Sequence, residues 1–298
     1  METVTALFGF AYQFVDNAGY LILAAVGLII IFGMMGVINM AHGELMMIGA
    51  YTTAVTYHMG LPAPLAILLA GVAAGLVGIL LERLIIQHFY RQLLSSLVVT
   101  WGISLMLSQG FLLAFGPSTL NVPTPFGSLS VGEQSFGVYR LVLAATALAL
   151  VALVWLIFAY TRIGTDARAT MENAKMAEAL GVNTGRVYAL TFGLGSALGG
   201  VAGGMFALTA TISPFFGVNY TPLAFITVVV GGSGNVVLGL LASVASLAGV
   251  QTVFTNAVSV YIGYVAMFAA ALLILLVLPS GISDYIERRR MRSLNKAQ

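Results

Sequence analysis

Six apolar segments run through this chain, each long enough to cross the hydrocarbon core of a bilayer. They lie at 18–38, 62–82, 93–115, 141–160, 187–210 and 259–278. A core of ~30 Å needs about 20 apolar helical residues, and lipid offers no partner for open backbone groups. Charged residues make up only 7% of the chain, whereas a soluble domain carries about 25%. The segments therefore predict an all-α fold, a polytopic transmembrane helical bundle forming one domain over residues 1–298.

Two further regions, 40–58 and 214–256, leave the number of crossings open. The first either spans the membrane or only dips into it, and the second is interrupted by GGSGN at 231–235. We expect about eight to ten helices, some of them broken or re-entrant. Met1–Asn17 has no Lys or Arg and no small-residue cleavage pattern, so a signal peptide is not expected.

Positive charge is concentrated in three places, which hold eleven of the twelve Lys and Arg residues and leave out only Arg140. The clusters are Arg83 and Arg91; Arg162, Arg168, Lys175 and Arg186; and Arg288, Arg289, Arg290, Arg292 and Lys296. The positive-inside rule places all three clusters, including the tail 281–298, on the cytoplasmic side. The segment 214–256 must then re-enter or cross twice, with GGSGN as its turn.

The same rule places the loop 116–138 outside, while the side of the N-terminus stays open. With three prolines and four glycines, this loop is expected to be extended or a short hairpin. It is either a plain connector or a docking surface for an external protein.

A polar cluster interrupts the apolar sequence near the N-terminus. The stretch MMGVINMAHGELMMIG (34–49) contains Asn39, His42 and Glu44. A carboxylate at a helix centre costs roughly 2.5–3.5 kcal/mol on insertion scales, so such a group is normally buried among helices or lines a watery path.

Broken segments in both halves of a chain point to a substrate path. Our hypothesis is that Asn39, His42 and Glu44, with Ser233 and Asn235 of the second broken segment, border a translocation pathway. The alternative is that Glu44 and His42 cap broken helices or satisfy one another.

The cytoplasmic loop 161–186 carries seven charged residues. Ala167–Leu180 is compatible with an amphipathic helix, and Gly181 is placed to end it. Such a helix between two spans would be a docking element for a soluble partner, although a solvated loop with a short helix is the simpler alternative.

Small residues follow one face of the segment 187–210. Gly195, Gly199 and Gly203 fall at successive i+4 steps, and this spacing lets helix backbones approach closely in a membrane. We expect a packing role for these three glycines.

Several kinds of chemistry have no support in the sequence. There is no cysteine, no G-x-x-x-x-G-K-[ST] run, and no metal-ligand spacing around His42, His58 or His88. The few basic residues sit beside the spans, which gives no support for nucleic-acid binding. We therefore expect no enzyme activity, metal or cofactor in this chain, and any active transport must draw energy from a separate subunit or an ion gradient.

Long motifs give the chain a resemblance to a known family. They are GVINMAHGELMMIGAY (36–51), RIGTDARATMENAKMAEALGVNTGRVYALTFGLGSALGGVAG (162–203), VVVGGSGNVVLG (228–239) and LPSGI (278–282). Together they resemble the permease subunits of the ATP-binding-cassette (ABC) importers for branched-chain amino acids, and the related urea and short-chain amide permeases, over nearly the whole chain.

The resemblance implies an inner-membrane permease with several partners. These are a homologous second permease, two cytoplasmic ATP-binding subunits that bind the ATP, and an external substrate-binding protein. It also implies that the 167–181 helix is the segment that couples to the ATPases, with Ala177, Glu178, Ala179 and Gly181 matching a degenerate Glu-Ala-Ala…Gly motif. Arg168, Glu172 and Lys175 belong to the same segment.

The cargo stays open between two classes. MAHGELMMIGAY, TWGISL (100–105), TFGLG (191–195) and Asn235 resemble the urea and amide permeases, whereas LPSGI and the basic tail resemble the branched-chain amino acid permeases. We expect a branched-chain amino acid importer, with the urea or amide importer as the alternative. An ion-coupled secondary transporter would explain the broken helices but not the charged cytoplasmic helix, and a membrane scaffold would leave the intramembrane Glu and His unexplained.

Overall fold

The prediction of an all-α polytopic bundle is confirmed. The computed structural model describes residues 2–90, 92–131, 134–232 and 234–295. Its helices are α1 (Glu2–Met35), α2 (His42–His58), α3 (Ala63–Leu84), α4 (Leu93–Phe115), α5 (Val138–Tyr160), α6 (Arg162–Ala179), α7 (Thr184–Phe206), α8 (Phe216–Gly231), α9 (Val236–Ala257), α10 (Val260–Val277) and α11 (Ile282–Asn295). A 3-10 turn, Ile86–Phe89, follows α3.

Seven helices in the described ranges are long and apolar enough to cross a membrane, namely α1 from Leu7 onward, α3, α4, α5, α7, α9 and α10. The helices α2 and α8 are shorter, with 17 and 16 residues. Together the nine fall within the expected eight to ten, and the chain is a multi-pass membrane protein. The segment 214–256 forms two helices, α8 and α9, separated at GGSGN.

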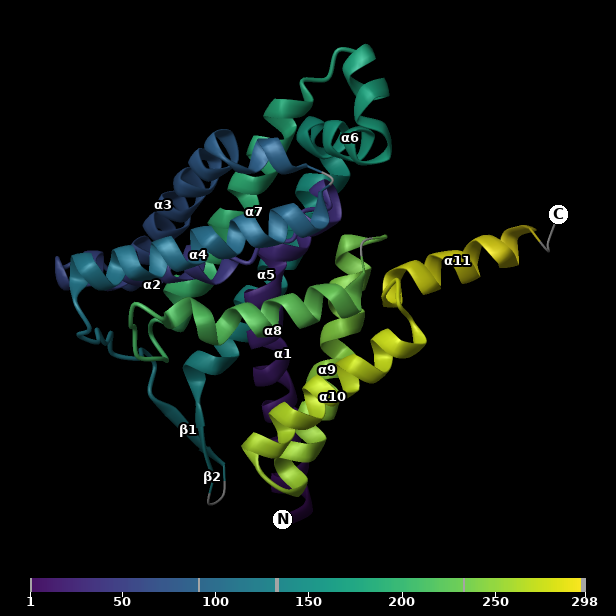
Figure 1. Ribbon diagram of the computed structural model, residues 1–298. Coiled ribbons are helices and arrows are strands. Elements are labelled where there is room, and N and C mark those ends of the chain that lie inside the picture. Colours follow the sequence, from purple (N-terminus) through teal and green to yellow (C-terminus); the bar gives the residue numbers. More distant parts are fainter. Residues whose placement is uncertain (1, 91, 132–133, 233, 296–298) are drawn as a thin grey trace.

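The bundle has two ends, which Figure 1 shows on opposite sides of the molecule. At the α6 end lie α6, α11 and the junction between α8 and α9. At the hairpin end lie the N-terminus and an antiparallel hairpin formed by β1 (Ser128–Val131) and β2 (Gln134–Gly137), with Leu129 opposite Phe136. The Tyr12 hydroxyl of α1 donates a 2.8 Å hydrogen bond to the Gly137 carbonyl and ties α1 to this hairpin.

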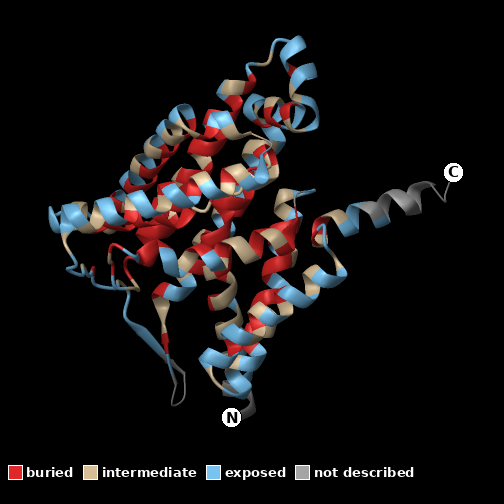
Figure 2. Ribbon diagram, viewed as in Figure 1, coloured by how far each residue is buried: buried red, intermediate tan, exposed pale blue. Residues whose placement is uncertain are grey.

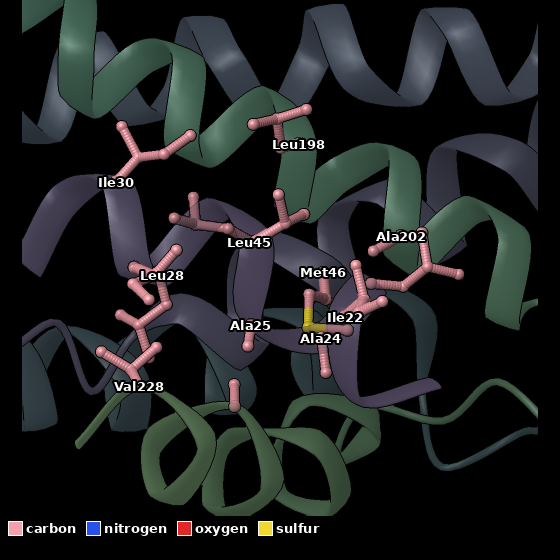
Figure 3. Packing of buried hydrophobic residues seen from close by; sticks show 14 of the residues in the cluster. Ile22, Ala24, Ala25, Leu28, Ile30, Leu45, Met46, Leu198, Ala202 and Val228 are labelled. Carbon is pink, nitrogen blue, oxygen red and sulfur yellow. The ribbon is translucent and has the colours of Figure 1, made fainter. Parts of the chain in front are cut away.

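The buried core centres on α1, α2, α7 and α8 (Figure 2). Ile30, Leu45, Leu198 and Val228, one from each of these helices, belong to one apolar cluster (Figure 3). In contrast, α4 and α10 have many large apolar side chains exposed, as expected for helices that face lipid or another subunit.

Two predicted helices differ clearly from those in the structure, and the first is α1, which begins at Glu2 instead of at 18. The segment expected at 18–38 ends at Met35, because Gly36 takes a left-handed conformation (φ +59°) while its amide still bonds the Phe32 carbonyl. A glycine adopts this conformation without a Cβ clash and ends the helix there.

The single helix predicted over Ala167–Leu180 is also wrong. Helix α6 begins earlier, at Arg162, and Asn173 interrupts it with extended backbone angles (φ −154°, ψ 98°). The Asn173 side-chain oxygen accepts a 3.1 Å bond from the Met176 amide, so this side chain caps a second helical piece instead of continuing the first. Gly181 has φ +89°, in keeping with its predicted place just beyond the helix.

Candidate functional site

The chain turns back into the bundle after α1. The His42 ring, at the first residue of α2, bonds the Ala24 carbonyl through Nε2 at 3.1 Å. Ala24 lies three helical turns before Met35, so the segment 36–41 returns about 16 Å along α1 before α2 begins. The polar cluster predicted at Asn39, His42 and Glu44 therefore lies inside the bundle, at the start of the short helix α2. With 17 and 16 residues, α2 and α8 are shorter than most of the spans, and they are called the half-helices below.

Thr100 of α4 holds this non-helical segment in place. Its hydroxyl accepts a 3.0 Å bond from the Met40 amide and lies 3.1 Å from the Ile38 carbonyl. Non-helical backbone at membrane depth must find such partners within the protein. The Asn39 side-chain oxygen adds a 3.1 Å bond from the Ala41 amide.

His42 sits in a pocket made by two glycines and is fully buried. A Cβ on Gly199 would lie 2.9 Å from the His42 Cε1 atom, and one on Gly27 would lie 3.0 Å from it. Because the Ala24 carbonyl can only accept, Nε2 donates, and the ring joins α2 to α1. This arrangement gives His42 at least a structural role.

Glu44 and Asn39 are almost completely buried, with exposed fractions of 1% and 2%. The Ser108 hydroxyl of α4 donates a 3.2 Å bond to Glu44 Oε1. Among the described residues, Glu44 Oε2 and Asn39 Nδ2 have no hydrogen-bond partner. Glu44 lies in the first turn of α2, where the helix dipole stabilises a negative charge. The cluster thus presents one unused acceptor and one unused donor inside the bundle.

The N-terminus of α8 meets the N-terminus of α2. A Cβ on Gly217 would lie 2.8 Å from the Glu44 amide nitrogen, and a Cβ on Gly43 would collide with the Gly217 carbonyl and the Thr221 hydroxyl. Backbones come this close only where both residues lack side chains.

From that junction the two half-helices run to opposite ends of the bundle. Tyr51 of α2 packs on Phe111 and Phe115 at the end of α4, from which the chain continues to the hairpin. In contrast, α8 ends at Gly231, beside Gly239 of α9 and the segment before α11. Half-helices that meet at their N-termini direct the positive ends of two helix dipoles at one place, the arrangement that transporters use for anionic substrate groups.

The three glycines of α7 each lie at a close helix approach. A Cβ on Gly195 would lie 2.6 Å from the Gly27 carbonyl of α1, and one on Gly203 would collide with the Met46 carbonyl of α2. Gly199 lies against the His42 ring. The stripe therefore brings α7 against α1 and α2 around the polar cluster.

The second broken segment lies elsewhere, at the α6 end. The Asn235 side chain is exposed and accepts a 3.0 Å bond from the Leu238 amide, which caps α9. Asn235 lines a cavity of about 240 Å³ together with Arg168 and Met171 of α6. Ser233 lies outside the described residues. The structure thus brings Asn39, His42 and Glu44 together and separates Asn235 from them.

The connection between α8 and α9 packs, at Gly232, on the segment that precedes α11. A Cβ on Gly232 would lie 2.7 Å from the Ser280 carbonyl, and one on Gly281 would lie 2.5 Å from the Gly232 Cα atom. Both glycines have positive φ, +82° and +84°. The motifs GGSGN and LPSGI, far apart in the sequence, form one glycine-to-glycine contact.

The expected coupling residues form the exposed surface of α6 and the turn after it. Arg168, Glu172, Lys175, Glu178, Ala179 and Gly181 are exposed, while Ala177 is buried. Met176 and Leu180 are also exposed, at 59% and 78%. Large apolar side chains among exposed charges outside the spans are typical of a protein contact surface.

Sequence reasoning missed the contribution of α4. Four small hydroxyl residues follow one of its faces at i+4 steps, and they are Ser96, Thr100, Ser104 and Ser108. Three of them are at least nine-tenths buried; Thr100 bonds the backbone of the segment before α2, and Ser108 bonds Glu44. The i+4 spacing of these residues in the sequence was the signal that could have revealed this polar face of α4. Within the described residues, no group of three His, Cys, Asp or Glu side chains could hold a metal ion.

Comparison with known proteins places this geometry in a family. The family model of the "branched-chain amino acid transport system / permease component" matches residues 11–278. The high-affinity branched-chain amino acid transport permease LivH of Salmonella typhimurium is 33% identical over 285 residues, covering 87% of this chain and 90% of that protein. BraD of Pseudomonas aeruginosa, described in the same words, is 32% identical over 286 residues, with the same coverage.

A more distant relative carries a different cargo in its name. The galactofuranose transporter permease YtfT of Escherichia coli is 30% identical over 201 residues, or 66% of this chain and 56% of that protein. No solved structure matches the chain. The family match covers nine-tenths of the chain and the nearer relatives cover almost as much, so this chain belongs to the family of branched-chain amino acid transport permease components.

Proposed function

We propose that this chain is the permease subunit of an ABC importer that moves branched-chain amino acids across the inner membrane. The junction of α2 and α8 beside buried Glu44 supports a transport role. Helix N-termini that meet within a membrane form binding sites in transporters. A carboxylate buried among the spans is costly, so packing against lipid alone does not explain Glu44. The exposed, charged α6 with Met176 and Leu180 carries the choice of an ATPase-driven permease over an ion-coupled transporter. The relatives' names favour branched-chain amino acids over urea or short-chain amides as cargo.

In this proposal Asn39, His42 and Glu44 border the translocation pathway near its middle. Asn235, and Ser233 beside it in sequence, would border the pathway where it opens at the α6 end. The unused Asn39 donor and Glu44 acceptor are groups that a polar substrate can engage in passing.

The α6 end faces the cytoplasm in this proposal, and the hairpin end faces outward. The charges support this orientation, because α6 and α11, which carry most of two of the three basic clusters, lie at one end in Figure 1, whereas Arg140 lies at the start of α5, directly after the hairpin at the other. The C-terminus and the tail 281–298 are then cytoplasmic, and the loop 116–138 is external.

The partners follow from the family. Two cytoplasmic ATP-binding subunits would hold the ATP, and one would bind the exposed surface of α6 around Met176 and Leu180. A homologous second permease would cover part of the exposed α4 or α10 surface, and an external binding protein would dock at the hairpin end. This chain itself would bind no cofactor and no nucleic acid.

Uptake of labelled leucine and labelled urea, side by side, tests the proposal in the source cells with and without this gene. We expect leucine uptake to fall on deletion and to return when the gene is restored, with urea uptake unchanged. Loss of urea uptake alone would overturn the branched-chain assignment, and no change in either would overturn both cargo assignments.

A further inference from the structure

Arg140 is the one basic residue outside the three clusters, and the structure places it at a buried carboxylate. Its Nη1 atom lies 2.5 Å from Oδ2 of Asp16, pairing α5 with α1 near the hairpin end. Asp16 is only 4% exposed, while the Arg140 side chain is half exposed. Within a membrane-spanning helix such a charged pair is rarely present without a function.

The pair has unused hydrogen-bonding capacity. Asp16 Oδ1 is buried and has no partner among the described residues. The guanidinium has five N–H donors, and in the described structure Asp16 is the only acceptor bonded to it. The pair can therefore take up one further anion at Arg140 and one further cation at Asp16 without being broken.

A cavity of about 320 Å³ adjoins the pair, between α1, α5, α8, α9 and α10. This volume lies within the roughly 300–1,000 Å³ typical of small-molecule sites. One part of its lining is polar, with Gln13, Asn17 and Gln251 beside the ion pair. Another part is apolar, with Leu21, Leu223 and Val260.

A second, larger space lies beside this cavity, next to the hairpin. It measures about 880 Å³, and Gln13 and Arg140 line both spaces. Ser135 and Phe136 of the hairpin line its outer part. A solute arriving at this end would meet Arg140 first and Asp16 behind it.

We propose that this cavity is a receiving site for a zwitterionic α-amino acid with an apolar side chain. Arg140 binds the α-carboxylate, Asp16 binds the α-ammonium, and the Leu223 side of the cavity holds the aliphatic group. The inference rests on the proposed import of branched-chain amino acids and adds a binding site to it. It also accounts for the one cation that the charge distribution leaves outside the cytoplasmic clusters.

The test measures binding of labelled leucine to the purified permease assembly without the external binding protein. Two competitors isolate the charges: leucinol lacks the carboxylate, and 4-methylpentanoate lacks the ammonium. We expect wild-type protein to bind leucine at millimolar concentration or below, with each analogue competing about tenfold less well, because each loses a charge-assisted bond.

The variants then give a pattern that a purely structural ion pair would not produce. Arg140→Gln should weaken leucine binding about tenfold and leave leucinol binding unchanged, since leucinol makes no use of Arg140. Asp16→Asn should weaken leucine binding and leave 4-methylpentanoate binding unchanged. An equal loss for all three compounds would overturn the proposal, as would the absence of leucine binding to wild-type protein.

Two further variants guard against misfolding. Asp16→Asn with Arg140→Gln removes both charges together, so neither is left buried alone, and it should assemble but bind leucine poorly. Glu82→Gln with Tyr90→Phe is the control, because it removes the charge of another buried carboxylate, Glu82 at the α6 end, and the Tyr90 hydroxyl that bonds it. This variant should bind leucine normally. If the double variant at Asp16 and Arg140 assembles and binds as wild type does, the site is refuted.

ATP-driven leucine uptake by the complete system is measured in parallel. If wild type takes up leucine, and Arg140→Gln binds and transports leucine as wild type does, the receiving site is refuted and the proposed function stands. No leucine uptake by wild type would refute the proposed function.

Discussion

The Ser108 hydroxyl of α4 donates a hydrogen bond to the Glu44 carboxylate of α2, and this bond lies next to the junction of two half-helices. The second oxygen of this carboxylate, Oε2, has no hydrogen-bond partner among the described residues and is open to another one. The relationship makes Glu44 the first residue to test in the proposed pathway.

Replacing Glu44 by Gln tests the pathway role of its charge. Gln keeps an oxygen for Ser108 and removes the charge, so we expect about a tenfold fall in leucine uptake with normal expression and normal ATPase coupling. Ser108→Ala is the matched control; it removes only the neutral bond and should cost less than about tenfold. Unchanged transport, expression and coupling in Glu44→Gln would exclude the pathway role.

Replacing Thr100 by Val should destabilise the re-entrant segment. Val preserves the shape but leaves the Met40 amide without its partner, at a cost of about 1–3 kcal/mol. Thermal unfolding of the purified protein should shift downward for Val and stay near wild type for Thr100→Ser, which keeps the hydroxyl. Equal melting of the two variants would show that the hydroxyl has no role.

Gly43→Ala should separate the half-helices. The added Cβ collides with the Gly217 carbonyl and the Thr221 hydroxyl, so we expect reduced yield of folded protein or a loss of uptake of tenfold or more. Gly102→Ala in α4 is the control, because a Cβ there meets nothing within 4 Å. That control should match or exceed wild-type stability, since Ala is a better helix former than Gly.

Gly199→Leu should abolish assembly by overpacking. Its Cβ alone would lie 2.9 Å from the His42 ring, and the rest of the side chain has no space between α7 and α2. Co-purification of the other subunits with the tagged variant measures this, with Gly249→Leu of α9 as the control, because a Cβ there meets only the Phe14 ring at 4.0 Å. A normal yield of the complex would contradict the packing role of the glycine stripe.

Met176→Ser with Leu180→Ser should uncouple transport from ATP hydrolysis. Both side chains are largely exposed, so folding should be unaffected, while contact with the ATPase subunit loses two apolar anchors. We expect weaker co-purification of the ATPase and about a tenfold fall in substrate-stimulated hydrolysis. Met59→Ser, 74% exposed at the end of α2, is the control, and an equal effect there would contradict docking on α6.

The sequence predicted the membrane-spanning helices well because a long apolar run has one stable form in lipid. The runs at 93–115, 141–160 and 259–278 match α4, α5 and α10 to within a few residues. Local patterns also predicted the turn at Gly181. The break at Asn173 was not foreseen, since an Asn in a polar helix can face solvent or cap a new turn, and only the surrounding structure decides between the two.

The candidate site was predictable only in part. The polar residues Asn39, His42 and Glu44 are close in sequence, so their proximity followed directly. Their partners Thr100 and Ser108 belong to another helix, and pairing between helices depends on packing that a single sequence does not specify. The same holds for Asp16 and Arg140, which are 124 residues apart.

The position of Thr100 also constrains how this protein is made. The Met40 amide and the Ile38 carbonyl find their partner about sixty residues further along the chain, in a helix that leaves the ribosome later. Until α4 has entered the membrane, the stretch between α1 and α2 would expose bare peptide groups to lipid. The backbone before α2 therefore has its polar groups paired only once α4 has joined α1 and α2, so a helix made later completes the burial of one made earlier.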